Sequence, residues 1–280
     1  MQRFLTIISN LAEKIMNTSV AIVIPLYKAQ LNSFEEISIR QCFKILSRFK
    51  IIAVKPQCLD LTDYPFKFDE VISFDDAFFA DIQGYNRLML SAIFYQSFLD
   101  FHHILIYQPD AFVFSDDLDY WCSAGYDYIG APWLVTYPDV IKKIKNTSLA
   151  FLQTKIKLNR SKSELLTKVQ FDNRVGNGGL SLRNTKKFFN ICQQEIEMIA
   201  FYNQKDEHYY NEDSFWCIEV NRNTKRLTIP GYKKAVYFAV ENFLPQAFKL
   251  TNGKLPFGCH AWDTHLDFWR PIFKEAGVNI

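Results

Sequence analysis

Carboxylate, imidazole and glycine residues occur in four short stretches of this chain, and groups of these types can do chemistry. Carboxylates and imidazoles bind divalent cations or move protons, and glycines let a ligand approach the backbone closely. The four stretches, with their candidate residues, are YQPDAFVF (Asp110), VGNGGLSLR (Gly178 and Gly179), NEDSFW (Glu212 and Asp213) and PFGCHAW (His260).

Each of these stretches also has a structural explanation that needs no ligand. A GNGG turn can be a crossing of backbones, and an acidic pair that opens a helix can be a cap. A single His among aromatic residues is commonly a core residue, and an Asp at a strand end can be a turn former. No one of the four stretches therefore establishes a site by itself.

Asp110 lies in a hydrophobic run that is interrupted. Residues 104–114 read ILIYQPDAFVF, with Gln, Pro and Asp in the middle. Pro109 lacks the N–H that a central strand needs, and a carboxylate resists burial without a partner. The pattern predicts that a buried strand ends here and that Asp110 emerges at its carboxyl end, where ligands bind in open α/β sheets.

Strand and helix patterns alternate through the first half of the chain, and helices follow in the second. This alternation predicts a mixed, mainly parallel sheet flanked by helices. Beyond residue 222 the sequence indicates aromatic strands and loops. We expect an N-terminal amphipathic helix over 1–19 and a single domain over 20–270. The expected strands are 20–27, 49–56, 70–75 and 103–107, and the expected helices are 34–49, 84–100, 184–201 and 211–222.

Taken together and in this order, the motifs resemble those of the GT-A glycosyltransferases. More narrowly, the chain is similar to a bacterial glycosyltransferase-like family still described as a domain of unknown function. The resemblance runs from about Val20 to Trp269 and implies a Rossmann-like GT-A fold. Its most specific stretches are IPLYK, YNRLMLS, ILIYQPDAFVF, YDYIGAPW, VGNGGLSLR, NEDSFW and PFGCHAW.

The resemblance implies a divalent metal, Mn²⁺ or Mg²⁺, that bridges the diphosphate of a nucleotide sugar. GT-A enzymes usually hold it with an Asp-x-Asp motif, which here reads Gln108-Pro109-Asp110 and lacks the first carboxylate. Asp110 and His260 are the implied metal ligands. Gln108 would then face the ribose or a metal-bound water, and an imidazole ligand favours Mn²⁺ somewhat over Mg²⁺.

The resemblance also implies that the acidic pair in NEDSFW is catalytic. Asp213 matches the position of the base in inverting enzymes, where a carboxylate removes the proton of the attacking hydroxyl. Glu212 would orient sugar hydroxyls. We expect the helix N-terminus to keep both carboxylates ionised.

Further residues are implied in binding the nucleotide sugar as donor. Pro25 and Tyr27 end the first strand where the nucleotide base would lie, and Arg87 would pair with the diphosphate or form a buried salt bridge. Arg183 is expected to be a structural cation. Glycines would let backbone amides approach a sugar or phosphate. The donor-binding set is Pro25, Tyr27, Arg87, Gln108, Asp110, Asn177, Gly178 and Gly179, with Trp133 and Trp262 as candidate stacking platforms.

Charge is concentrated in an expected insertion over about 137–168. Between Val140 and Lys168 eight Lys and Arg residues accompany a single acidic residue, Glu164, whereas the whole chain carries only +2. The segment is either solvated surface or a face for anionic lipid or glycan. The N-terminal helix, likewise, either docks on the domain or lies on a membrane surface.

Composition narrows the classes of function. The six cysteines show no metal-ligand spacing, which indicates free, mostly buried thiols, and no apolar stretch is long enough to span a membrane. The basic residues lack the aromatic interleaving of a nucleic-acid binder. A second cluster of metal ligands, which a metallohydrolase would need, is missing.

The sequence thus favours a cytoplasmic, inverting, metal-assisted glycosyltransferase, either free in the cytoplasm or peripheral on the inner face of the cytoplasmic membrane. Its donor would be a nucleotide sugar, most simply a UDP-sugar, from which a hexosyl group is transferred. Its acceptor would be a bacterial surface glycan or lipid-linked glycan, such as a lipopolysaccharide, O-antigen or capsule precursor. The alternative is a glycan- or nucleotide-binding module with a degraded active site, which the missing carboxylate at Gln108 suggests.

Overall fold

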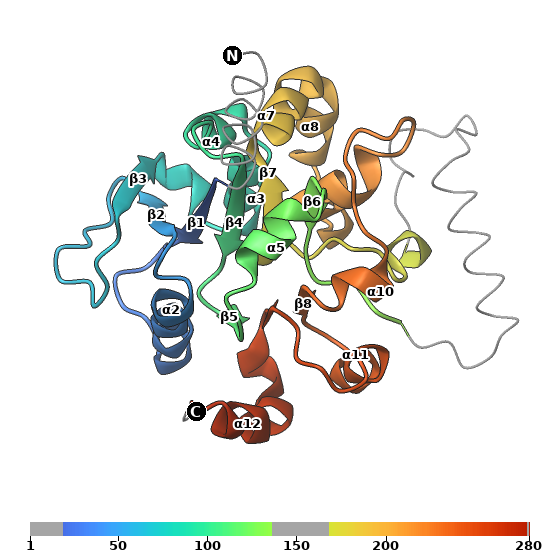
Figure 1. Ribbon diagram of the computed structural model, residues 1–280. Helices are drawn as coiled ribbons and strands as arrows, with labels where there is room; N and C mark the ends of the chain where they lie inside the picture. Colours follow the sequence, from blue (N-terminus) through green and yellow to red (C-terminus); the bar gives the residue numbers. More distant parts are fainter. Residues whose placement is uncertain (1–18, 136–167, 279) are drawn as a thin grey trace, which may run out of the picture.

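A six-stranded sheet forms the centre of the molecule (Figure 1). The computed structural model describes residues 19–135, 168–278 and 280. Along the sheet the order of strands is β3-β2-β1-β4-β7-β6. Their bounds are β1 (Val20–Pro25), β2 (Lys50–Pro56), β3 (Glu70–Phe74), β4 (His103–Tyr107), β6 (Tyr128–Ile129) and β7 (Leu180–Asn184).

Strand direction in this sheet is mainly parallel. β1 pairs in parallel with β2 and β4, and β2 with β3, whereas β7 runs antiparallel to both β4 and β6. The chain moves outward from β1 to β2 and β3, then returns to place β4 on the other side of β1. This reversal opens a crevice beyond the carboxyl ends of β1 and β4. The predicted mixed, mainly parallel sheet is confirmed.

Helices cover both faces of the sheet. Ala21 and Val23 of β1 pack with the core of α3, α4, α7 and α8, and the alternate residues Ile22 and Ile24 pack with α2 and α5. This alternation follows from the two-residue period of a strand. The bounds are α2 (Ser33–Ile45), α3 (Ile82–Met89), α4 (Ala92–Gln96), α5 (Leu118–Ser123), α7 (Thr185–Gln194) and α8 (Ile196–Tyr202), with short η1 (Asp76–Phe78), η3 (Lys168–Phe171) and η4 (His208–Tyr210).

A second, smaller sheet lies below the first in the view of Figure 1. Its order is β5-β9-β8, and Trp269 and Phe273 of α12 pack on it in a third core. The expectation of strands and loops to the end of the chain is therefore wrong, because two amphipathic helices, α11 and α12, cover this sheet. The bounds are β5 (Phe112–Val113), α10 (Tyr232–Ala235), β8 (Ala239–Val240), α11 (Leu244–Leu250), β9 (Gly258–Cys259), η6 (Trp262–His265) and α12 (Leu266–Glu275).

Three expected helices are divided. The one over 84–100 becomes α3 and α4, because the Ser91 side chain accepts a hydrogen bond from the Phe94 amide and starts a new helix. The one over 184–201 breaks at Glu195. The one over 211–222 becomes α9 (Glu212–Ser214) followed by a π-helix, η5 (Phe215–Glu219).

Some expectations concern residues outside the described ranges. These are the N-terminal helix over 1–19, except for Ser19, and nearly all of the basic insertion over 137–168. All six cysteines are free and only Cys58 is exposed, which confirms the expectation of free, mostly buried thiols. Within the described residues, none of the helices has the length and hydropathy needed to cross a bilayer.

Candidate active site

A cavity of about 640 Å³ lies beyond the carboxyl ends of β1 and β4. Its wall contains Pro25 at the end of β1 and Tyr27 after it, and Gln108 and Asp110 after β4. The Tyr27 ring is 55% exposed and is therefore available to a ligand. The residues expected to bind the donor base are thus on the same cavity as the proposed metal motif. The wall also contains Asn177, Gly178, Gly179, Glu212, Asp213 and His260.

Strand register explains why the glycine turn reaches this cavity. β7 runs antiparallel to β4, and Tyr107 at the end of β4 is paired with Leu180 at the start of β7. The turn that precedes β7 therefore lies beside the segment that follows β4. The Gln108 amide donates to the Gly179 carbonyl at 2.9 Å, which extends this pairing by one step.

The second sheet brings His260 together with three other polar side chains. Cys259 of β9 is paired with Phe112 of β5 and with Val240 of β8, so the residues at the adjoining strand ends become neighbours. His260 Nε2 is 2.9 Å from Gln108 Oε1 and 3.1 Å from Asp110 Oδ1. His260 Nδ1 is 3.2 Å from Glu241 Oε1.

Acceptors on both sides of the imidazole favour its charged form. Burial opposes that form, but the hydrogen bonds to Asp110 and Glu241 outweigh it and raise the pKa of His260 to about 10. Burial likewise opposes ionisation of Asp110, and its hydrogen bond to His260 lowers the pKa of that carboxyl below its usual value. Without a metal, the two side chains thus form an ion pair.

The same side chains suit a divalent cation. A carboxylate oxygen, an amide oxygen and an imidazole nitrogen converge at one point, and Glu241 holds the far ring nitrogen as an outer-shell carboxylate does in metal sites. Among the described residues there is no cluster of three His, Cys, Asp or Glu side chains that could hold a metal. The cation would have only one carboxylate and one imidazole, besides Gln108, and would rely on the donor for further ligands.

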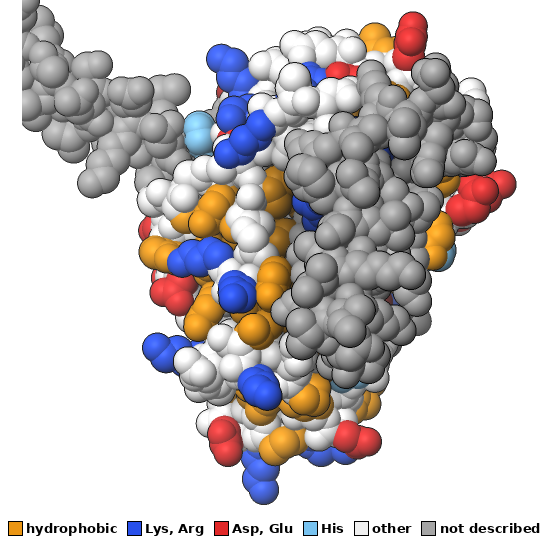
Figure 2. All heavy atoms as spheres, turned by 90° about the vertical axis from the view of Figure 1, so that its right-hand side faces the viewer, with side chains coloured by type: hydrophobic (Ala, Val, Ile, Leu, Met, Phe, Trp, Pro, Cys, Tyr) orange, Lys and Arg blue, Asp and Glu red, His pale blue; other side chains and the backbone are white. Residues whose placement is uncertain are grey.

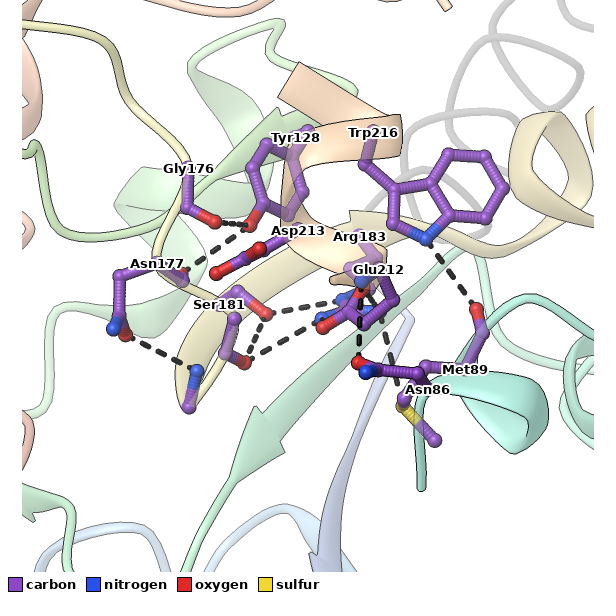
Figure 3. Close-up of polar contacts among 12 residues, drawn as sticks. Asn86, Met89, Tyr128, Gly176, Asn177, Ser181, Arg183, Glu212, Asp213 and Trp216 are labelled. Atoms are coloured by element: carbon purple, nitrogen blue, oxygen red, sulfur yellow. Dashed lines mark hydrogen bonds and ion pairs between the residues drawn. The ribbon is translucent and has the colours of Figure 1, made fainter. Parts of the chain in front are cut away.

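Glu212 is held by a buried arginine (Figure 3). Arg183 Nη2 donates to Glu212 Oε1 at 3.0 Å and Nη1 to Oε2 at 3.2 Å, and the Arg183 side chain is fully buried. The guanidinium also donates hydrogen bonds to the hydroxyl groups of Ser181 and Tyr95. The expected structural role of Arg183 is confirmed. Both Glu212 oxygens are engaged by Arg183, so this pair fixes the position of Glu212 in the cavity wall.

Asn86 fixes the acidic motif from the opposite side. Its Oδ1 accepts a hydrogen bond from the Glu212 amide at 3.1 Å, and its Nδ2 donates to Asn211 Oδ1 at 3.0 Å. Asn86 thus accepts a hydrogen bond from a backbone amide at the start of this helix, as an N-cap side chain usually does. α3 and α9 are locked together at the edge of the cavity.

Asp213 has a different environment from Glu212. Its carboxylate lies apart from the Arg183 pair, on the side of Gly176 and Asn177 (Figure 3). Burial and the neighbouring Glu212 charge raise the pKa of Asp213 to about 8. The expectation that the helix end keeps both carboxylates ionised is therefore wrong for Asp213, because burial and the Glu212 charge outweigh the effect of the helix N-terminus.

A π-helix follows these carboxylates directly, over Phe215–Glu219. Such segments are rare and are frequent at functional sites. All of its residues are buried, so its unusual winding is maintained by the core.

The two glycines of the turn make room for side chains of the site. A Cβ on Gly178 would lie 2.4 Å from Glu212 Oε1, and one on Gly179 would lie 1.9 Å from His260 Nε2. We expected these glycines to let backbone amides approach a ligand. The structure gives a more direct reason for glycine at both positions, which is that a side chain there would collide with Glu212 or His260. The Gly179 amide itself donates to Asn177 Oδ1 at 3.1 Å.

We expect Gly179→Ala to displace His260 and to destabilise the protein by about 1–3 kcal/mol, since the added methyl has no space. Gly231→Ala is the matched control, because a Cβ there meets nothing within 4 Å. Chemical denaturation of both variants checks the difference. Equal stability of the two variants would contradict the close packing of Gly179 against His260.

We expect Arg183→Met to destabilise the fold by about 3–5 kcal/mol, because Glu212 would be left buried without its charge partner. Arg87→Met is the control and should change stability by less than about 0.5 kcal/mol. Urea unfolding measures both. Adding Glu212→Gln to Arg183→Met should restore part of the lost stability, because the unpaired buried charge is removed. If the double variant is no more stable than Arg183→Met, loss of the ion pair is not the cause of the destabilisation.

Three other expected residues are not at the cavity. Arg87 does not line it, and its guanidinium lies 3.5 Å from the Ala77 carbonyl with no ion pair among the described residues. Trp262 is fully buried and donates to Ser38, and Trp133 packs on Phe171. Trp262 therefore belongs to the packing of the fold and cannot stack on a sugar, whereas Trp133 is half-buried and does not line this cavity.

Sequence reasoning missed Glu241, Asn86 and Tyr85. Glu241 directly follows the short strand β8, and Asp110 lies three residues beyond the end of β4, so a strand-end signal was present for both. Asn86 and Tyr85 lie within YNRLMLS, a stretch in which only Arg87 was singled out. Their contacts depend on the pairing of α3 with α9, 125 residues away, which no local pattern reveals.

The family described as "Protein of unknown function (DUF5672)" matches residues 69–260, more than half of the chain. The chain belongs to this family. A search among curated proteins gives no match.

Two solved structures are similar in fold. The galactosyltransferase LgtC, crystallised with donor and acceptor sugar analogues, superimposes with a TM-score of 0.50 at 12% identity, over 86% of each chain. The apo form of the glycosyltransferase GlyE from Streptococcus pneumoniae TIGR4 gives 0.46 at 13% identity, over 87% of this chain and 54% of that one. The likeness to LgtC supports the predicted GT-A-type fold and by itself says nothing of chemistry.

Proposed function

We propose that the protein is a metal-assisted glycosyltransferase that moves a sugar from a nucleotide sugar to a glycan acceptor. The observation that carries the proposal is the wall of one cavity, which contains both the Asp110–His260–Gln108 group and Asp213. A charge-binding group and a carboxylate with a pKa near 8 are the two components that glycosyl transfer requires.

The donor would lie along the carboxyl ends of β1 and β4. Pro25 and the exposed Tyr27 ring would contact the nucleoside, with UDP as the proposed nucleotide. Asp110 and His260 would hold Mn²⁺ or Mg²⁺ near the diphosphate, with Gln108 beside them. When bound, the cation would neutralise the charge that develops on the leaving diphosphate.

Asp213 is the proposed base. An acceptor hydroxyl must lose a proton as it attacks, and a base with a pKa near the working pH accepts that proton most effectively. The Arg183–Glu212 pair would hold the Asp213 backbone in place while Glu212 keeps the Asp213 pKa high. Direct attack of the hydroxyl would invert the anomeric configuration.

A glycan- or nucleotide-binding module is the second candidate. It is favoured by one observation, the direct pairing of Asp110 with His260 where a second carboxylate is replaced by Gln108. A binding module would retain nucleotide sugar without ever cleaving it, so turnover separates the two candidates.

The proposed acceptor is a bacterial surface glycan or its lipid-linked precursor, met at the inner face of the membrane. The basic residues over 140–168 support an anionic acceptor surface. On the face seen in Figure 2, Lys and Arg side chains are interspersed with hydrophobic ones, which suits the same kind of partner.

We expect reversal of Lys142, Lys143 and Lys145 to Glu to reduce binding to phosphatidylglycerol vesicles at low salt, since surface charge acts within a Debye length. Donor hydrolysis should be unaffected. If the variant sediments with vesicles as the wild type does, or if the wild type does not sediment with them at all, the segment is ordinary solvated surface.

The proposed function is tested with a panel of nucleotide sugars in the presence of Mn²⁺. One of them should raise the unfolding temperature and be hydrolysed slowly without an acceptor. At a ligand concentration one hundredfold above Kd the stabilisation is about 2.7 kcal/mol, which is readily measured. Stabilisation with no hydrolysis and no transfer would favour the binding module, and no stabilisation by any donor would contradict both.

A further inference from the structure

One residue of the cavity wall has a side-chain hydroxyl with no hydrogen-bond partner among the described residues. Tyr85, on α3, lines the cavity, and its Oη is buried without a hydrogen bond within the described structure. A buried hydroxyl that is unpaired destabilises the fold, so such groups in native proteins call for an explanation.

Other tyrosines around the site are satisfied. Tyr95 Oη donates to the Met89 carbonyl at 2.9 Å, Tyr128 Oη to the Gly176 carbonyl at 2.6 Å, and Tyr107 Oη to the Ser38 carbonyl at 2.8 Å. The fold therefore supplies partners for tyrosine hydroxyls in this region. Tyr85 differs from these three in that its side chain borders the cavity.

The position of Tyr85 indicates what its partner would be. The next residue, Asn86, binds the Glu212 amide, so Tyr85 is fixed beside the acidic motif. Burial raises the pKa of Tyr85. Arg183 and the Gln108 side chain lower this pKa, although Gln108 does not reach hydrogen-bond geometry with the hydroxyl, and the charges of Glu212 and Asp110 raise it. The hydroxyl thus lies between the acidic motif and the end of β4. In the proposed arrangement the cation and diphosphate lie at Asp110 and His260 and the base is Asp213, so a hydroxyl between these two parts of the cavity wall would meet the sugar that joins them.

We propose that the Tyr85 hydroxyl binds the transferred sugar of the donor, donating a hydrogen bond to one of its hydroxyl oxygens. The inference rests on the proposed function and extends it by naming a residue that selects the sugar. A site with a buried hydroxyl that waits for a sugar oxygen discriminates against a donor that lacks that oxygen, because the tyrosine would stay unpaired.

Tyr85→Phe tests the proposal, since it removes the hydroxyl and little else. Calorimetric titration would use whichever of UDP-glucose, UDP-galactose or UDP-N-acetylglucosamine binds the wild type with Mn²⁺. The variant should bind that nucleotide sugar roughly three- to tenfold more weakly, as expected for one neutral hydrogen bond, and should bind UDP alone with unchanged affinity. Its unfolding temperature should not fall, because the hydroxyl has no hydrogen-bond partner among the described residues.

Tyr64→Phe is the matched control. The Tyr64 hydroxyl is also buried without a partner in the described structure, but its side chain does not line the cavity. This variant should bind the nucleotide sugar as the wild type does. A loss of the same size in Tyr64→Phe would overturn the proposal, because removal of any unpaired hydroxyl would then be sufficient.

Monodeoxy analogues of the bound sugar identify the partner oxygen. For the wild type, one analogue should bind more weakly than the complete sugar. For Tyr85→Phe, the same analogue and the complete sugar should bind equally well, which is the coupling expected of a direct contact. Unchanged nucleotide-sugar affinity in Tyr85→Phe, or equal losses for UDP and UDP-sugar, would overturn the inference alone. Failure of the wild type to bind any of the nucleotide sugars would instead contradict the proposed function and the inference with it.

Discussion

Replacing Asp213 with Asn is expected to lower glycosyl transfer by about 10²–10⁴-fold, the usual contribution of a general base. Asn keeps the size of Asp and much of its hydrogen bonding but cannot accept the proton of the acceptor hydroxyl. Donor affinity should hardly change, because the base acts on the acceptor side of the reaction. Transfer is measured with the nucleotide sugar found in the donor panel and a native glycan acceptor.

Two controls accompany this variant. Glu212→Gln should have a milder effect on transfer and should lower stability, since it weakens the pair with Arg183. The anomeric configuration of the product, read by NMR, should be inverted relative to the donor. Full activity of Asp213→Asn would remove Asp213 as the base, and a retained configuration would remove the inverting mechanism.

The same substitution should stabilise the protein, and the effect should depend on pH. Asp213 has a pKa of about 8 in the fold, against about 3.8 for an ordinary Asp carboxyl, so between these values the folded state binds more protons than the unfolded one. Wild-type stability contributed by this group is therefore lost as pH rises from about 4 to about 8. Asn cannot ionise and avoids this loss.

The unfolding temperature of Asp213→Asn, compared with wild type at each pH, should thus be similar near pH 4 and higher at pH 8. Each 1 kcal/mol corresponds to a shift of about 2–4 °C. Wild-type transfer should rise with pH through about 8, as the base becomes ionised. A variant that loses activity while gaining stability would show that Asp213 is kept for chemistry rather than for the fold.

Asp110→Asn is expected to abolish most of the Mn²⁺-dependent binding of UDP, with a loss of about 10²–10³-fold. A cation beside a diphosphate contributes several kcal/mol of charge stabilisation, and each 1.36 kcal/mol is a factor of ten. Asp110 is the one carboxylate in contact with His260 Nε2, so no described neighbour can replace it there. Calorimetric titration of UDP with and without Mn²⁺ measures the loss.

Asp263→Asn is the matched control, because Asp263 is a carboxylate that lines the same cavity. It should keep the dependence of UDP binding on Mn²⁺. His260→Ala should resemble Asp110→Asn, and Glu241→Gln should be intermediate, since Gln still accepts the Nδ1 proton. Metal-dependent binding that survives in both Asp110→Asn and His260→Ala would exclude these residues as ligands.

Local pattern alone was sufficient for four of the six strands of the main sheet, β1 to β4, whereas β6 and β7 were not among the expected strands. Short apolar runs that end at Pro25, Pro56 or Gln108 are buried strands, and their alternation with helical patterns requires a mainly parallel sheet. The position of Asp110 at the end of a strand followed from proline and from the difficulty of burying a carboxylate, both of which are local properties.

Tertiary structure alone decided the composition of the site. Glu241 contacts His260 because β8 pairs with β9, and Asp110 contacts His260 because β5 also pairs with β9. Strands of only two residues leave little pattern in the sequence. The pKa of Asp213 is raised by burial under distant segments and by the charge of Glu212, which Arg183 holds in place. The glycines of VGNGG likewise owe their positions to side chains of Glu212 and His260 that only the fold brings within contact. A sequence states which groups are present, whereas pairing across long separations fixes which of them meet and how much water remains around them.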